Sequence, residues 1–216
     1  MDSKTYFRGY LRKHFAPLLH SLGFTGKGSN FRRVVGEAIH CVNLQGDKYS
    51  GSCAVNLGLH LTFLPIEHSG DLPDIETIEE VSCEFRDRLT PEGVFDYWWK
   101  YKCSKSQLIE NAEHLIRTYK EQGEPRFAQF ASTEQIAEMM TVDDIRLNSA
   151  PTGFRFSTTH TVKAALAMAR IHFHIGNFEV ALEFANAGME KVESWSPRKA
   201  KLQAMIDETA RRLAHR

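Results

Sequence analysis

Seven polar side chains recur at alternate positions in three segments of the chain. They comprise amides, a histidine, a glutamate and two arginines, namely Asn43, Gln45, Asn56, His60, Glu84, Arg86 and Arg88. Amides and guanidinium groups bind a carboxylate, a phosphate or a peptide backbone with fixed geometry. His60 or Glu84 could also act as a base. Together with Trp98 and Trp99, these residues form the candidate site for a ligand or a partner.

A structural role for the same residues is the alternative. Polar groups on the outer face of a sheet are commonly solvated or hydrogen-bonded to one another. Here such bonds would fix the segment that carries Trp98 and Trp99. The simplest use of the two tryptophans is as anchors in a core or an interface, and stacking on a nucleobase is another. The sequence leaves these roles open.

The common catalytic and metal-binding motifs are absent, since the chain has no HExxH, GxSxG or CxxC and no Walker-type phosphate loop. The segment Gly23–Ser29 is glycine-rich, but it follows an expected helix, whereas a phosphate-binding loop follows a strand. His172 and His174 lie two residues apart on an expected helix and so point to different sides. We predict no catalytic residue, no metal site and no cofactor.

The expected elements place the polar residues on one face of a sheet. Alternation of apolar residues predicts strands at 30–35, 38–46, 52–63 and 81–89, joined in part by turns at 36–37 and 47–50. We expect Val42 opposite Val55, which brings Asn43 beside Ala54. The polar side chains then share the outer face, because a slip of one residue would bury them.

Helices are expected on the other face of this sheet. Apolar spacing predicts helices at 4–22, with a kink or break near Ala16 caused by Pro17, and at 106–122. Thr90-Pro91 is typical of a helix start, so we expect a helix over 90–99 with both tryptophans on one side. The predicted class is α+β: a small, mostly antiparallel four-stranded sheet with helices packed on one face.

A helical C-terminal subdomain is expected at 151–216, after an α+β domain at 1–150. Within it, the segment 168–185 resembles a single tetratricopeptide repeat, with small residues where two helices would cross and Gly176-Asn177-Phe178 at the turn. Repeat arrays generally need about three repeats to be stable. We therefore expect a helical hairpin and a capping helix rather than a peptide-binding groove.

A second resemblance covers about residues 10–105. It rests on ordered segments, namely Leu18-Leu19, Leu22-Gly23-Phe24, Phe31-Arg32-Arg33, Val42-Asn43-Leu44-Gln45, Val55-Asn56-Leu57-Gly58, Cys83-Glu84-Phe85-Arg86-Asp87-Arg88-Leu89 and Trp98-Trp99. Together they resemble the bacterial DUF4304 family. The resemblance implies an α+β domain and no established activity, and it suggests an immunity role at the level of the family.

Charge and composition narrow the class of partner. Lysines and arginines equal aspartates and glutamates at 27 each, which gives no support for binding to nucleic acid or to a membrane. The charge is uneven, however: residues 1–35 hold seven basic residues and one acid, and residues 67–96 hold ten acids and two arginines. Such segments either face solvent or select a charged partner.

The sequence therefore predicts a non-catalytic binding protein of the cytoplasm. No apolar run approaches the ~20 residues that span a bilayer, the N-terminus lacks the apolar core of a signal peptide, and four cysteines without a CxxC pair suggest reduced thiols. We expect a protein partner and an immunity or accessory role. The alternative is an enzyme or binding module for a phosphorylated or carboxylated small molecule at the outer sheet face.

Overall fold

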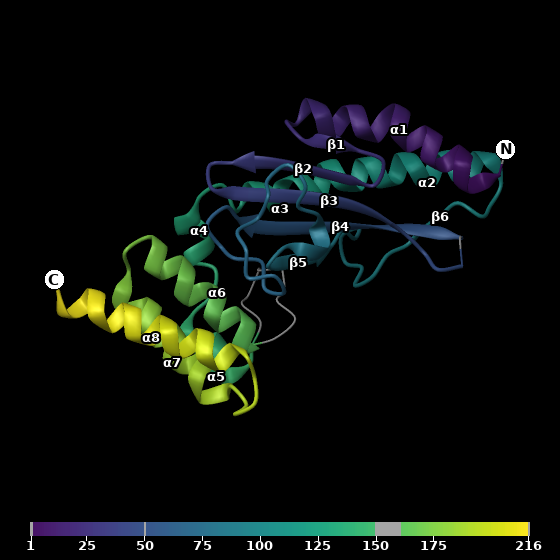
Figure 1. Cartoon of the computed structure of the whole chain (residues 1–216). Coiled ribbons are helices and arrows are strands. Elements are labelled where there is room, and N and C mark those ends of the chain that lie inside the picture. Colours follow the sequence, from purple (N-terminus) through teal and green to yellow (C-terminus); the bar gives the residue numbers. More distant parts are fainter. Residues whose placement is uncertain (1, 50, 150–160, 216) are drawn as a thin grey trace.

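A six-stranded antiparallel sheet lies at the centre of the structure, a computed structural model that describes residues 2–49, 51–149 and 161–215 (Figure 1). Its strands are β1 (Thr25–Lys27), β2 (Asn30–Val35), β3 (Ala38–Gly46), β4 (Ser52–Leu61), β5 (Phe85–Arg88) and β6 (Trp99–Lys100). The order is β1-β2-β3-β4-β5, and β6 also pairs with β4. The predicted α+β class is confirmed, with two more strands than expected.

The register between β3 and β4 differs by two residues from the predicted one. Asn43 pairs with Asn56 rather than with Ala54. The connecting loop is wider than expected because the Ser52 hydroxyl donates a hydrogen bond of 2.6 Å to Asp47 Oδ2 within it. Since side chains alternate with a period of two, this shift leaves every residue on its predicted face.

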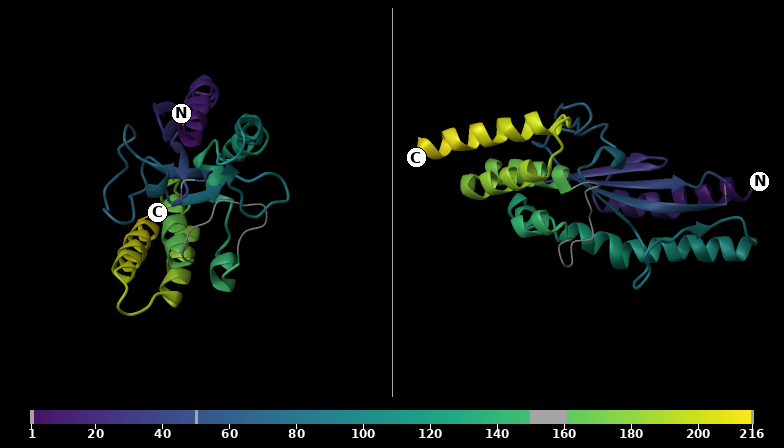
Figure 2. Two further views of the ribbon diagram at one scale, coloured as in Figure 1. Left: turned by 90° about the vertical axis from the view of Figure 1, so that its right-hand side faces the viewer. Right: turned by 90° about the horizontal axis from the view of Figure 1, so that it is seen from below.

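Helices α1 (Ser3–Ser21) and α2 (Lys105–Thr118) cover one face of the sheet and enclose the main core (Figure 2). α1 continues through Pro17 without the predicted break. It buries apolar residues at four-residue spacing, namely Phe7, Leu11, Phe15 and Leu19. A π-helical turn, η2 (Tyr119–Gly123), and helix α3 (Glu124–Ala128) follow α2, and the Phe127 ring stacks on His40 at 4.5 Å.

The segment between β4 and β6 departs most from prediction. Instead of one strand over 81–89, a 3-10 turn η1 (Glu80–Ser82) precedes the short β5. The predicted helix over 90–99 is wrong: Gly93 has a φ of 73°, which interrupts a right-handed helix. Trp99 instead opens β6, which pairs with Cys53 of β4 and so satisfies backbone groups beyond the end of β5.

The C-terminal helices extend the molecule beyond one end of the sheet (Figures 1 and 2). They are α4 (Thr133–Ala137), α5 (Val142–Leu147), α6 (Thr161–His174), α7 (Phe178–Lys191) and α8 (Arg198–Ala214). α6 and α7 form the predicted hairpin, and α8 packs against both. The expected domain boundary at 150/151 lies outside the described residues. Within the described ranges, every helix is too short or too polar to cross a bilayer.

The outer face of the sheet, opposite α1 and α2, is covered in part by η1. This turn packs directly on β4 at Gly58, where an added Cβ would lie 2.7 Å from Cys83 Sγ and 3.1 Å from the Glu80 Cα. Ile39, Cys41, Ile78 and Cys83 form a second, small apolar cluster at this contact. Only glycine at position 58 allows the two backbones to approach this closely.

We predict that Gly58→Ala lowers the free energy of unfolding by about 1–3 kcal/mol, because the methyl group must displace η1. Urea denaturation followed by circular dichroism measures this change. Gly9→Ala in α1 is the matched control: its Cβ meets no atom within 4 Å, so it should raise the free energy of unfolding by about 0.5–1 kcal/mol. Equal effects at the two sites would contradict the packing described.

Candidate functional site

A chain of side-chain hydrogen bonds crosses the outer face from β2 to β5. Asn43 Nδ2 donates to Asn30 Oδ1 at 2.6 Å. Asn56 Nδ2 donates to Asn43 Oδ1 at 3.4 Å and to Gln45 Oε1 at 2.9 Å. Arg88 donates to the same Gln45 oxygen at 3.0 Å. Four strands thus contribute to one hydrogen-bonded row.

A carboxylate closes each end of this row. Asn30 Nδ2 donates to Glu79 Oε1 at 2.6 Å, and Arg88 donates to Asp96 Oδ1 at 3.2 Å. The Trp98 indole donates to the other Asp96 oxygen at 3.1 Å, and the Arg88 guanidinium lies 4.7 Å from the Trp98 ring centroid. We call the full set the polar ladder: Glu79, Asn30, Asn43, Asn56, Gln45, Arg88 and Asp96.

The polar ladder is a row of donors and acceptors that are already ordered. Each member has a partner within the ladder, so no ligand is needed to satisfy these groups. Gln45 is exposed and Asn43 is half-buried, and their remaining lone pairs and N–H groups can meet a partner's backbone or polar side chains. The ladder contains no hydroxyl or thiol nucleophile.

Two of the predicted site residues point elsewhere. Arg86 forms a two-pronged ion pair with Glu80 of η1, at 2.6 and 3.1 Å, and so holds η1 to β5. Trp99 is 0% exposed on the helix-covered face, where its ring lies 5.0 Å from that of Tyr97. The two tryptophans therefore lie on opposite faces of a strand, because side chains alternate there. The expectation of a shared helix side is wrong.

His60 and Glu84 are buried near the end of the sheet, where α6 begins. The Glu84 amide donates to His60 Nδ1 at 2.9 Å, and Lys163 of α6 lies 3.5 Å from Glu84 Oε1. Burial lowers the pKa of His60 to about 4, and Lys163 adds to this effect. Burial raises the pKa of Glu84 to about 7, against the opposing charge of Lys163. These groups join α6 to the sheet and lie apart from the polar ladder.

Three ladder members, Asn30, Glu79 and Asp96, were not among the predicted site residues. A two-residue turn at 36–37 pairs residues 35 and 38 and, counted back along both strands, places Asn30 opposite Asn43. That signal was present in the sequence. Glu79 and Asp96 lie in loops, whose positions no periodicity reveals. Among the described residues, no group of three or more potential ligands could hold a metal ion.

Glu84 should make the stability of the protein depend on pH. Its pKa is about 7 in the folded protein, above the ordinary value of 4.5, so the folded state holds the extra proton between these values and loses stability as the pH rises. The difference between Glu84→Gln and the wild type should thus grow by about 3 kcal/mol in favour of the variant from pH 4.5 to 8.

Urea denaturation across this pH range measures that difference. The comparison with the variant is essential because the low pKa of His60 has the opposite effect: stability is lost as the pH falls from 6.5 towards 4. A difference between the two proteins that is independent of pH would show that the pKa of Glu84 is the same in the folded and unfolded states, which would contradict its burial as a protonated acid.

Comparison with known families shows a match for the part of the chain that forms the sheet. The model of a family described as "Domain of unknown function (DUF4304)" matches residues 15–129, which include all six strands. The match confirms the resemblance noted over residues 10–105 and extends it through α3. It does not include the C-terminal helices, for which the tetratricopeptide resemblance stays a prediction. Curated proteins and solved structures give no match. Over more than half of its length, the chain belongs to the DUF4304 family.

Proposed function

We propose that this protein is a non-catalytic binding protein that contacts a partner protein through the part of the outer sheet face left uncovered by η1. We call this part the ladder face: the polar ladder together with Val94, Phe95 and Trp98. One observation carries the proposal. Phe95, adjacent in sequence to ladder residue Asp96, is 98% exposed.

An aromatic side chain in this position is costly to leave in water and well suited to a partner's pocket. Aromatic residues are enriched among the side chains that dominate binding energy at protein interfaces. Val94 is exposed beside Phe95, and Val81 is exposed on η1. Polar groups of fixed geometry beside exposed apolar ones are typical of an interface.

The best-formed cavities of the structure lie away from the ladder face. Three cavities lie between α1 and the sheet, between Phe63 and the C-terminal helices, and between α1 and α2. None is lined by Asn43, Gln45, Asn56 or Arg88. A small ligand usually needs a concave site that encloses most of its surface. A protein partner needs no such cavity.

The charge around the ladder face favours a partner with a basic surface. Six carboxylates of the segment 67–96 are exposed: Asp71, Asp74, Glu76, Glu79, Glu92 and Asp96. Arg32 of β2 donates to the Ile78 carbonyl at 2.9 Å and holds this acidic segment against the sheet. Complementary charge would guide and orient such a partner.

An immunity or accessory protein acts in this way, by covering a surface of another protein. The proposed location is the cytoplasm. All four cysteines are free thiols, including the buried Cys41 and Cys83, as is usual in a reducing compartment.

We predict that Phe95→Ala abolishes capture of the partner from cells that produce the protein, because removing a central aromatic anchor weakens binding by about 30-fold or more. Capture with tagged wild type and variants, followed by Kd measurement with the purified partner, tests this.

Tyr49→Ala is the control, since Tyr49 is also an exposed aromatic residue, at 85%, but belongs to the β3–β4 loop. It should retain the partner. Circular dichroism should show that both variants are folded. Equal retention by the wild type and Phe95→Ala would refute the ladder face as the binding surface.

A further inference from the structure

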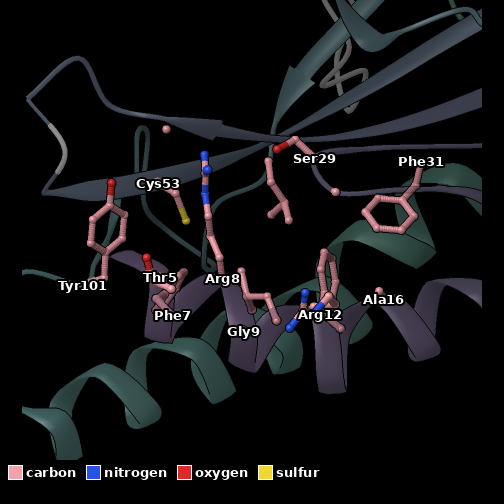
Figure 3. Close-up of a pocket in the computed structure, with 15 residues that line it drawn as sticks. Thr5, Phe7, Arg8, Gly9, Arg12, Ala16, Ser29, Phe31, Cys53 and Tyr101 are labelled. Atoms are coloured by element: carbon pink, nitrogen blue, oxygen red, sulfur yellow. The ribbon is translucent and has the colours of Figure 1, made fainter. Parts of the chain in front are cut away.

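A cavity of about 330 Å³ opens between α1 and the sheet, on the side opposite the ladder face (Figure 3). Its apolar lining is contributed by α1 and by the facing strands, and it includes Phe7, Leu11, Phe15, Phe31 and Leu44. The volume is at the small end of the range for ligand pockets. The cavity therefore suits a small molecule with an apolar portion.

Two arginines line the same cavity from successive turns of α1. The Arg8 side chain reaches from the helix towards the strands, and Arg12 lies one turn further along (Figure 3). Neither guanidinium forms an ion pair or hydrogen bond with any residue in the part of the chain that the structure describes. The Arg8 guanidinium reaches the strands and can hold a carboxylate or a phosphate, to which arginine donates charge-assisted hydrogen bonds, whereas the Arg12 guanidinium stays close to the helix (Figure 3).

Tyr101, at one end of the cavity, provides an independent sign of a missing partner. It is only 3% exposed, and its hydroxyl has no hydrogen-bond partner. A buried hydroxyl without a partner is unfavourable by about 1–3 kcal/mol, so such groups are usually satisfied by a ligand or by water. Cys53 lies beside Tyr101 (Figure 3), and burial raises the pKa of its thiol to about 12, so it is no nucleophile.

The surrounding charges favour one orientation of a molecule bound in the cavity. Burial raises the pKa of Tyr101, and Asp47 adds to this effect while Arg8 opposes it, so the hydroxyl stays protonated and can donate a hydrogen bond to an anion beside Arg8. The anionic group of an occupant should therefore lie at Arg8, with its apolar portion along Leu44 and Phe31.

We propose that this cavity binds a small organic anion, whose carboxylate or phosphate is held by Arg8 and whose apolar portion occupies the space between α1 and the sheet. The inference is independent of the proposed partner, because the cavity shares no residue with the ladder face.

Titration of the ¹⁵N-labelled full chain with octanoate and with phenyl phosphate, followed by ¹H–¹⁵N correlation spectra, tests the proposal. We expect saturable shifts with at least one of them, confined to α1, residues 28–31 and 44–46, and Tyr101. The preferred probe identifies the head group. Octan-1-ol and inorganic phosphate, which each lack half of the expected contacts, should bind at least about tenfold more weakly than the preferred probe. Absence of saturation by both anions up to about 10 mM would overturn the proposal.

Three variants separate the proposed contacts from general effects. Arg8→Ala should weaken binding by at least about tenfold. Gly46→Val should place a side chain in the cavity and so block it. The site has room for this side chain, because the one atom within 4 Å of an added Cβ is the flexible end of Arg8, at 3.9 Å. Lys13→Ala removes a charge from the same helix outside the lining and should leave the Kd unchanged. Unchanged binding in both the arginine and Gly46 variants would also overturn the proposal.

Discussion

The close approach of η1 to β4 at Gly58 is the contact on which the outer face depends. Because position 58 has no side chain, the backbone at Glu80 and the thiol of Cys83 lie directly on the sheet. This contact brings Glu80 to Arg86 and carries Glu79 to the first rung of the polar ladder at Asn30. It also divides the outer face into a part covered by η1 and an open part. The ladder face is therefore defined by backbone packing as much as by its own side chains.

The two faces of the sheet are stabilised by different interactions. The face towards α1 and α2 buries an alternating apolar set from β4, and this burial supplies most of the favourable free energy of folding. The outer face carries amides that would be unfavourable without partners, and the ladder satisfies them across four strands. The donors and acceptors of this row, beside exposed Phe95, are already ordered. Binding of another protein therefore costs less side-chain conformational entropy.

Sequence periodicity predicted the faces well and the connections poorly. Alternation in β4 correctly placed Leu57 and Asn56 on opposite faces of the sheet. The error of two residues in the β3–β4 register left both on their predicted faces. The segment 90–99 was mistaken for a helix because a threonine and a proline are typical of a helix start. Strand pairing of Trp99 with Cys53 outweighed that local preference. Asn30 could have been found by counting back from its turn, whereas Glu79 and Asp96 required the loops to be placed in space.

Site-specific cross-linking tests the central claim most directly. A photo-activatable benzoylphenylalanine at position 95, in the full chain expressed in its own cells, forms covalent bonds only with what touches that position. The account predicts one dominant protein adduct at position 95 and none of that size at position 49, which is also exposed but lies in the β3–β4 loop. An adduct at position 49 without one at position 95, or no adduct at position 95 at all, would contradict the assignment of the ladder face as the binding surface.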